Sequence, residues 1–390
     1  MNNLLLIKNG KIITENGIIS KENVLIKGGK IIEISATETT DAEIIDANGC
    51  YVSPGFIDTH VHGGGGYDFM DGGEEPIIKA AEFHLSHGTT TILPTTLSCS
   101  FDTLKEFMTT LKAVMEKGLC KANIPGAHLE GPYFALAQCG AQNPDYITPP
   151  VPTEYEEIIK TFGNIVKKWS FAPENPGSEE FCEALTGAGI VPSAGHSDGT
   201  FEDMEKVYKK GCKHFTHLYS GMSTITRQDG YRKLGIIESA YYYDDVYAEV
   251  IADGKHLPPE LLKLIVKCKG TEHICLVTDA MRGAGQLSGE SYLGKKGEEV
   301  PCIIDDGVAK LPDLSAFAGS VATADRLVRT MVKEAYISVS DAVKMITEVP
   351  AEICGFATKG KIKENYDADI VIFDDNINVK HVIVGGKIIK

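Results

Sequence analysis

Short β-type runs alternate with helix-type segments through the middle of the chain, from Ser53 to Gly355. Eight apolar runs have the length and composition of buried strands: GFIDTHVH, TTTILPT, ANIPGAHLE, KKWSFAPE, IVPSAGH, KHFTHLY, YAEVIAD and HICLVTD. Helical patterns are present at Glu74 to His87, Phe101 to Lys117, Ser178 to Ala188, Phe201 to Lys210, Pro258 to Lys267 and Val321 to Glu334. This alternation is typical of a parallel sheet with crossover helices. It predicts a (β/α)8 TIM barrel over residues 53–355.

The two ends of the chain have a different pattern. Residues 1–52 contain the β-type runs LLLIKNGKII, VLIKGGKIIEI and AEIIDANG, and residues 356–390 contain ADIVIFDD and VKHVIVGGKIIK. Neither end alone can bury both faces of a sheet, so we expect the two ends to join into one small β-sandwich domain. The predicted class is α/β. A doubly wound open sheet is the main alternative, but no G-x-G-x-x-G motif lies at a first strand-to-helix turn.

Charge and composition restrict the partners. A formal net charge of -16 disfavours nucleic acid and anionic membranes, and no basic stripe offsets it. No apolar run approaches the ~20 residues of a membrane span, and the N-terminal region lacks the features of a signal peptide. The ten cysteines include no C-x-x-C pair, which favours reduced thiols. We therefore expect a soluble cytoplasmic protein with no nucleic-acid or membrane partner.

Polar side chains end five of the eight β-type runs, and each can bind a metal ion or transfer a proton. They are His60 and His62, Glu130, His196, His217 and Asp279. The carboxyl ends of barrel strands meet at one mouth, so these residues should converge. His60 and His62 are two positions apart, which places both imidazoles on one face of a strand. One histidine at a strand end is usually a plain surface residue, but the joint pattern predicts a site for a divalent metal such as Zn or Fe.

The other histidines have simpler interpretations. His128 shares a strand face with Glu130, and we expect it to form a hydrogen bond to a metal ligand rather than to bind the ion. The remaining five are assigned to structure or to the surface: His84, His87, His214, His273 and His381.

A family resemblance follows from the order of the motifs PGFIDTHVHG, HLEGPYF, GHSDGT, THLYSGM, EVIADGKH, LVTDAM and FAGS. Together they closely resemble the N-acetylglucosamine-6-phosphate deacetylases of the amidohydrolase superfamily, over nearly the whole chain. HLEGP with the two later histidine motifs is specific to that family, whereas H-x-H and the terminal aspartate occur across the superfamily. The resemblance implies that Glu130, His196 and His217 hold the principal divalent metal. Because His60 and His62 are present, both one and two ions remain open.

The resemblance also implies a reaction. Asp279 is expected to be the catalytic acid–base, which accepts a proton from the attacking water and delivers it to the sugar nitrogen. A bound divalent cation would activate the water and polarise the amide oxygen. The expected reaction is hydrolysis of the N-acetyl group of N-acetylglucosamine 6-phosphate, giving glucosamine 6-phosphate and acetate.

Substrate contacts are implied in the same way. His256 matches the phosphate-binding histidine, and Arg227 is its expected partner, contributed by a neighbouring subunit in a homodimer. The other implied contacts are Ala141, Gln142, Ser220, Gly221, Phe317, Ala318, Gly319 and Ser320.

The sequence departs from the family pattern in the motifs that are implied to contact the substrate. Ser220-Gly221 replaces the usual Asn-Ala, Arg227-Gln228-Asp229-Gly230 replaces Arg-Glu-Pro-Gly, and Gln138-Cys139 replaces a Lys pair. Arg232 is an alternative to Arg227. A galactosamine epimer, another acyl group and an unphosphorylated sugar therefore remain open.

Two other functions compete with this one. A cyclic-amide hydrolase on the same scaffold usually bridges two metals with a carboxylated lysine, but no lysine ends any of the β-type runs. A silent sugar-phosphate sensor is the second alternative, and the complete set of hydrolytic residues argues against it.

Overall fold

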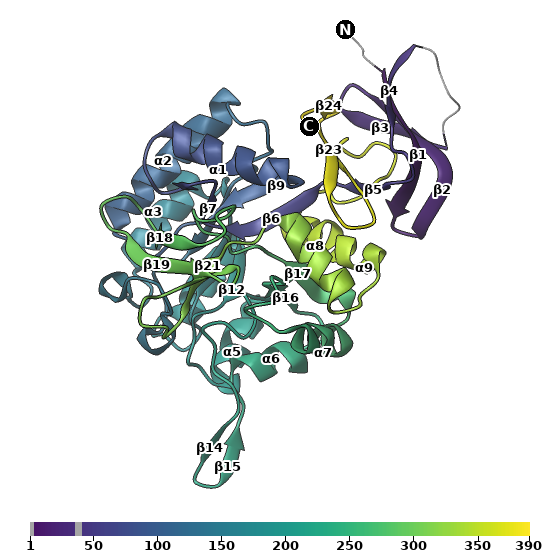
Figure 1. Cartoon of the computed structure of the whole chain (residues 1–390). Coiled ribbons are helices and arrows are strands. Elements are labelled where there is room, and N and C mark those ends of the chain that lie inside the picture. Colours follow the sequence, from purple (N-terminus) through teal and green to yellow (C-terminus); the bar gives the residue numbers. More distant parts are fainter. Residues whose placement is uncertain (1–3, 36–40) are drawn as a thin grey trace.

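The predicted barrel is present in the computed structural model, which describes residues 4–35 and 41–390 (Figure 1). Each of the eight β-type runs overlaps one barrel strand. The strands are β6 (Phe56–Val61), β9 (Thr89–Pro94), β10 (Ala127–Glu130), β11 (Val166–Phe171), β12 (Val191–Ala194), β13 (His214–Phe215), β16 (Tyr247–Val250) and β17 (Ile274–Leu276).

Closure of the barrel depends on two seams. Strands β10 to β13, β16 and β17 form one parallel sheet in chain order, and β6 pairs with β9 in parallel. Bridges from Thr95 to His128 and from Val61 to Ala280 join the two pieces at either side. All eight carboxyl ends consequently lie at the same rim.

Six helices agree in position with those predicted from the sequence. They are α1 (Glu74–Ser86), α2 (Phe101–Lys117), α4 (Ser178–Gly187), α5 (Phe201–Lys209), α7 (Pro259–Lys269) and α8 (Ala324–Lys333). Local signals explain several boundaries. Thr200 and Asp203 form a capping box at the start of α5, and Gly118 ends α2 in the left-handed region with φ 59°.

Four helices were not predicted: α3 (Pro152–Phe162), α6 (Ile236–Tyr242), α9 (Val339–Ile346) and α10 (Glu348–Ile353). Three of them have eight residues or fewer, too short to present a clear helical period. The fourth, α3, starts directly after the turn-like sequence ThrProProVal.

The two ends of the chain share one eight-stranded sheet. Its strands are β1 (Leu4–Thr14), β2 (Gly17–Lys27), β3 (Lys30–Ile34), β4 (Ala42–Asp46), β5 (Tyr51–Pro54), β22 (Ile370–Phe373), β23 (Val379–Val384) and β24 (Lys387–Ile388). Strand β5 connects the halves, because it pairs with β1 on one side and with β22 on the other. The expected sandwich is this single connected sheet, which has a hydrophobic core of its own.

We place the domain boundary at Gly55, between β5 and β6, slightly later than the predicted boundary between residues 52 and 53. The second predicted boundary, between residues 355 and 356, follows the end of α10. Residues 1–3 and 36–40, which belong to the predicted N-terminal part, lie outside the described residues.

Two insertions into the barrel were also missed. A four-stranded antiparallel sheet comprises β18 (Gly289–Leu293), β19 (Val300–Asp305), β20 (Val308–Lys310) and β21 (Phe317–Ser320). The FAGS motif is β21. A hairpin of β14 (Thr226–Gln228) and β15 (Tyr231–Lys233) projects from the body of the barrel (Figure 1). A minor hairpin, β7 (Gly63–Gly64) with β8 (Tyr67–Asp68), follows the first barrel strand. Among the described residues, no helix has both the length and the apolarity to cross a bilayer.

Candidate active site

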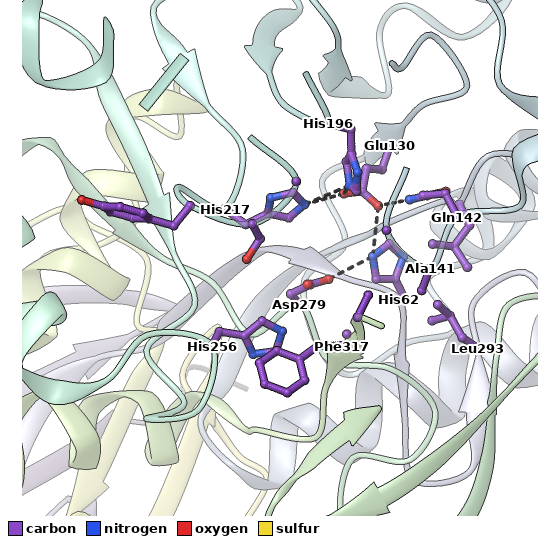
Figure 2. Close-up of a pocket in the computed structure, with 17 residues that line it drawn as sticks. His62, Glu130, Ala141, Gln142, His196, His217, His256, Asp279, Leu293 and Phe317 are labelled. Atoms are coloured by element: carbon purple, nitrogen blue, oxygen red, sulfur yellow. Dashed lines mark hydrogen bonds and ion pairs between the residues drawn. The ribbon is translucent and has the colours of Figure 1, made fainter. Parts of the chain in front are cut away.

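The six residues predicted to bind metal or transfer protons converge at the carboxyl rim of the barrel, and Figure 2 shows all of them except His60. Four barrel strands and the segments that follow them supply His60 and His62, Glu130, His196, and His217, and Asp279 follows the last strand. We call these six residues the donor cluster.

The carboxylate of Glu130 lies at the centre of the donor cluster. Its Oε1 is 3.0 Å from Nε2 of His217, 3.2 Å from Nε2 of His196 and 3.3 Å from Nε2 of His60. The Nε2 atoms of His196 and His217 are 3.1 Å apart. Ligands of a tetrahedral ion at about 2.0 to 2.1 Å lie about 3.3 Å from one another. The donor atoms therefore have the spacing and chemistry that a divalent cation requires.

A second group of donors adjoins the first. Nε2 of His62 is 3.1 Å from Oδ1 of Asp279 and 3.4 Å from the other oxygen of Glu130. Nε2 of His60 is 3.5 Å from the same Asp279 oxygen. Glu130 thus faces both groups, one oxygen toward each, and the arrangement fits either one ion or two.

The site is buried, yet its carboxylates are held in the charged form. Burial raises the pKa of Glu130, but the three imidazoles around Oε1 outweigh burial and hold that pKa well below its usual value. Burial also opposes ionisation of Asp279, yet His60 and His62 lower its pKa to about 2. Burial disfavours a charged His62, but Asp279 and Glu130 raise its pKa to about 10. Two negative charges in a buried pocket provide the electrostatic attraction that a cation needs.

Backbone conformation helps to aim three of these side chains. His196, His217 and Asp279 have φ values of 46°, 26° and 48°, in a region that residues with a Cβ seldom occupy. Each follows the end of its strand, where the chain turns sharply. Such strain persists only where surrounding contacts impose it, and it is concentrated at functional sites.

Neighbouring groups hold the donors in place. Nδ1 of His196 lies 2.8 Å from the carbonyl oxygen of Gln138. The side-chain amide of Gln142 donates to Glu130 at 2.6 Å, and its oxygen accepts the backbone N–H of Ser98 at 2.7 Å. Gln142 was predicted to contact substrate. It faces the cavity, but its polar atoms already orient Glu130.

His128 lies beside the donor cluster without joining it. Its ring contacts that of His60 edge-on, with centroids 4.5 Å apart, and its Nε2 is bonded to the hydroxyl of Ser170 at 2.7 Å. The expected hydrogen bond to a metal-binding residue is therefore replaced by one to a serine. Other histidines are occupied elsewhere: His84 pairs with the carbonyl of Gly63 and His87 with Asp325.

A cavity of about 300 Å³ opens onto the donor cluster. It is lined by His62, Leu97, Glu130, Gly140, Ala141, Gln142, His196, His217, Tyr219, Ser220, Gly221, His256, Asp279, Leu293, Ala316, Phe317 and Gly319. Seven of the ten predicted substrate contacts belong to this lining. Leu97 and Leu293 were missed, since an apolar residue in a loop or inserted strand carries no signal for substrate contact.

The other three predicted contacts lie outside the lining. Ala318 and Ser320 are on the opposite face of β21 from Phe317 and Gly319, because successive strand residues point to opposite sides. Ser320 instead donates from its hydroxyl to Thr278 and from its backbone N–H to the carbonyl of Asp279. Arg227 is exposed on the projecting hairpin.

Comparison with known proteins agrees with this geometry. The model of the amidohydrolase family matches residues 51–389. This chain belongs to the amidohydrolase family. Amidohydrolases depend on metal ions, and the donor cluster contains groups of side chains that could hold one.

Individual amidohydrolases resemble the chain over nearly its full length. It is 31% identical over 389 residues to an N-acetylglucosamine-6-phosphate deacetylase of Lysinibacillus sphaericus, with 98% of this chain and 97% of the relative covered. It is 29% identical over 384 residues to an N-acetylgalactosamine-6-phosphate deacetylase of Escherichia coli O157:H7, with 97% of each covered. A mutant N-acetylglucosamine-6-phosphate deacetylase of Mycobacterium smegmatis, solved with N-acetyl-D-glucosamine-6-phosphate, superposes with a TM-score of 0.89 at 26% identity, covering 99% of both chains. The family resemblance seen in the motifs is confirmed.

Replacing Glu130 by Gln should abolish tight metal binding in this amidohydrolase, because the central carboxylate contacts both groups of donors. We expect affinity for Zn²⁺ to fall by more than about 100-fold. Metal content after dialysis, measured by mass spectrometry, checks this. His273→Gln, at the other end of a barrel strand, is the control and should retain wild-type content. A Glu130→Gln protein that keeps its full metal complement would contradict the assignment.

Proposed function

We propose that this amidohydrolase removes the acetyl group from N-acetylglucosamine 6-phosphate, giving glucosamine 6-phosphate and acetate. The main support is that one cavity contains residues suited to amide hydrolysis and a residue suited to binding a phosphate group. The donor cluster with Asp279 provides for amide hydrolysis, and His256 provides for a phosphate. The named activities of the similar proteins point to the same substrate class.

The proposed chemistry assigns the proton transfers to Asp279. A divalent cation in the donor cluster would supply Lewis acidity to the amide oxygen and to water. The low pKa of Asp279 keeps its carboxylate ionised, and an ionised carboxylate can accept the proton that the attacking water loses. It then donates this proton to the amide nitrogen as the C–N bond breaks, so that the sugar leaves as an amine.

His256 is held as a charged group for an anionic ligand. Its Nδ1 lies 2.8 Å from Oδ2 of Asp253, whose other oxygen accepts the backbone N–H groups of Lys255 and His256. Burial disfavours the imidazolium, but Asp253 outweighs burial and raises the pKa of His256. The ring also packs against Phe317, with centroids 4.7 Å apart. Nε2 is left to bind the phosphate.

Deacetylation of N-acetylgalactosamine 6-phosphate is the second candidate. A relative with that name is nearly as similar as the first, and Ser220-Gly221 departs from the usual Asn-Ala where the cavity contacts the sugar. An unphosphorylated N-acyl sugar is a further alternative. A cyclic-amide hydrolase is disfavoured because Glu130 occupies the position between the two donor groups.

We also propose a homodimer in which the β14–β15 hairpin reaches the neighbouring cavity. Arg227 and Arg232 face each other across this hairpin, where both are exposed. Like charges directly opposite are unfavourable unless an anion lies between or beside them. The hairpin projects away from its own barrel (Figure 1), which supports a role at a second subunit.

A cytoplasmic location is part of the proposal. All ten cysteines are free, including the buried Cys182, Cys212, Cys275 and Cys302. Unpaired thiols in this number suit a reducing compartment.

Acetate release across N-acetylglucosamine and N-acetylgalactosamine, each with and without the 6-phosphate, tests the proposed substrate. We expect the highest kcat/KM for N-acetylglucosamine 6-phosphate. Asp279→Asn should retain the ion held by Glu130, His196 and His217 but lose at least about 10³-fold in kcat, since it cannot take up the proton. Higher efficiency on the galactosamine epimer would select the second candidate, and substantial turnover by Asp279→Asn would reject the proton-transfer role.

Phosphate affinity should depend on pH through His256. Because the imidazolium binds the phosphate and its pKa is raised, KM should stay low below that pKa and rise as pH increases through it. Asp253→Asn removes the stabilising charge, so the rise should begin at lower pH. His256→Gln should raise KM by about 10- to 100-fold below that pKa, where the wild type has the imidazolium, and the difference should shrink above it. An identical KM profile for wild type and Asp253→Asn would contradict this role.

Mixing two inactive variants tests the hairpin. In a dimer of Arg227→Ala with Asp279→Asn, one cavity receives both an intact Asp279 and an intact partner arginine. Random subunit exchange should therefore restore about a quarter of the wild-type rate. Arg232→Ala in place of Arg227→Ala identifies which arginine acts. If the mixtures stay inactive although the subunits exchange, neither arginine acts across the interface.

A further inference from the structure

A buried ion pair lies directly behind the donor cluster. Glu249 on β16 and Lys168 on β11 are both fully buried, and the Lys168 ammonium donates to Oε1 of Glu249. The other oxygen, Oε2, is 2.9 Å from Nδ1 of His60 and accepts the backbone N–H of His217 at 3.2 Å. One carboxylate thus contacts two members of the donor cluster.

Stability alone is a weak reason for such a pair. Moving two charges out of water is costly, and apolar residues of similar volume often serve a core equally well or better. Here each charged residue lies within a strand that is almost wholly buried. The proton transfers assigned to Asp279 also make no use of it. A role in orienting His60 and His217 accounts for the position of the ion pair.

The pair fixes which nitrogen of His60 carries the proton. Since Nδ1 donates to Glu249, the lone pair is on Nε2, which points toward Glu130 and Asp279 at 3.3 and 3.5 Å. Nε2 has no hydrogen-bond partner among the described residues, as expected of an atom prepared for a cation. A carboxylate behind a histidine also raises its basicity as a ligand.

Within the donor cluster, His60 is distinctive in having a carboxylate as the partner of its Nδ1. Nδ1 of His196 is paired with a neutral carbonyl, and Nδ1 of His62 and of His217 has no hydrogen-bond partner in the described part of the chain. His60 is also the residue shared by both possible metal groups, one with Glu130 and His217 and the other with His62 and Asp279. The best-oriented imidazole is therefore the one between the two groups.

Lys168 supplies the charge balance. Without it, Glu249 would add a third buried negative charge beside Glu130 and Asp279. With it, the ion pair is neutral, and Glu249 acts on His60 as a hydrogen-bond acceptor rather than as a competing ligand for the cation.

We propose that Lys168 and Glu249 are positioning residues that set His60 as a ligand through Nε2, so that the centre holds two divalent ions. The inference rests on the metal centre of the proposed function. It adds that the ion bound by His60, His62 and Asp279 depends on a pair that touches neither ion nor substrate.

A calorimetric titration of the chelator-treated protein with Zn²⁺ tests the proposal, because it measures ion binding independently of enzymatic turnover. The wild type should bind two ions. Lys168→Met with Glu249→Leu removes the acceptor but keeps an apolar core, and the weaker of the two ions should bind about 10- to 100-fold less tightly. Lys168→Met with Glu249→Gln keeps an acceptor for His60 and should largely restore that ion.

Two further variants keep the test decisive. Glu249→Asp keeps the charge but withdraws the carboxylate from His60, and it should weaken the same ion if the Leu variant does not fold. Ser170→Ala, a buried change on the same strand as Lys168, is the matched control and should bind both ions normally. Thermal unfolding after chelation establishes that each variant is folded.

Three results would overturn the proposal: a wild type that binds only one ion, folded Leu and Asp variants with unaltered affinities, or a Ser170→Ala protein with the same loss. The proposed function fails separately. A protein that binds two ions as described but releases no acetate from any sugar in the panel would refute the deacetylase and leave the role of Lys168 and Glu249 intact.

Discussion

The backbone hydrogen bond from the amide of Asp279 to the carbonyl of His60, 2.8 Å long, joins the last barrel strand to the first. It converts a row of parallel strands into a ring, and only in a ring do residues 60 and 279 become neighbours. The same contact sets the height of His60 and Asp279 relative to each other, so that their side chains meet at one rim. The donor cluster depends on this closure, since the remaining donors come from strands on either side of the seam.

The strands and the six principal site residues could be predicted because both follow a regular period. Buried strands are visible as apolar runs, and the rule that parallel strands end at one rim predicts that His60, His62, Glu130, His196, His217 and Asp279 lie together. The short helices and the inserted sheet lacked such a period. Ala318 and Ser320 were included with their neighbours because the strand character of FAGS was not recognised, and the alternation along β21 separates the four residues.

The ion pair behind the metal centre illustrates a different difficulty. Lys168 and Glu249 lie within apolar runs, where a charged residue is easily assigned to the solvent side of a strand. Their mutual contact joins two strands that are not adjacent in the sheet and cannot be deduced from either run alone. A charged residue at the centre of an otherwise fully buried parallel strand is the sequence signal that would have found them.

The shared terminal sheet has a consequence for how the protein is made. Strand β5 obtains β22 as its antiparallel partner, yet more than three hundred residues of chain separate the two. On the ribosome, the first strands therefore emerge long before the segment that covers their open edge, and the whole barrel is synthesised in the interval. An uncovered edge can pair with other chains. The nascent polypeptide thus passes through a period of exposure that ends only when β22 has left the exit tunnel.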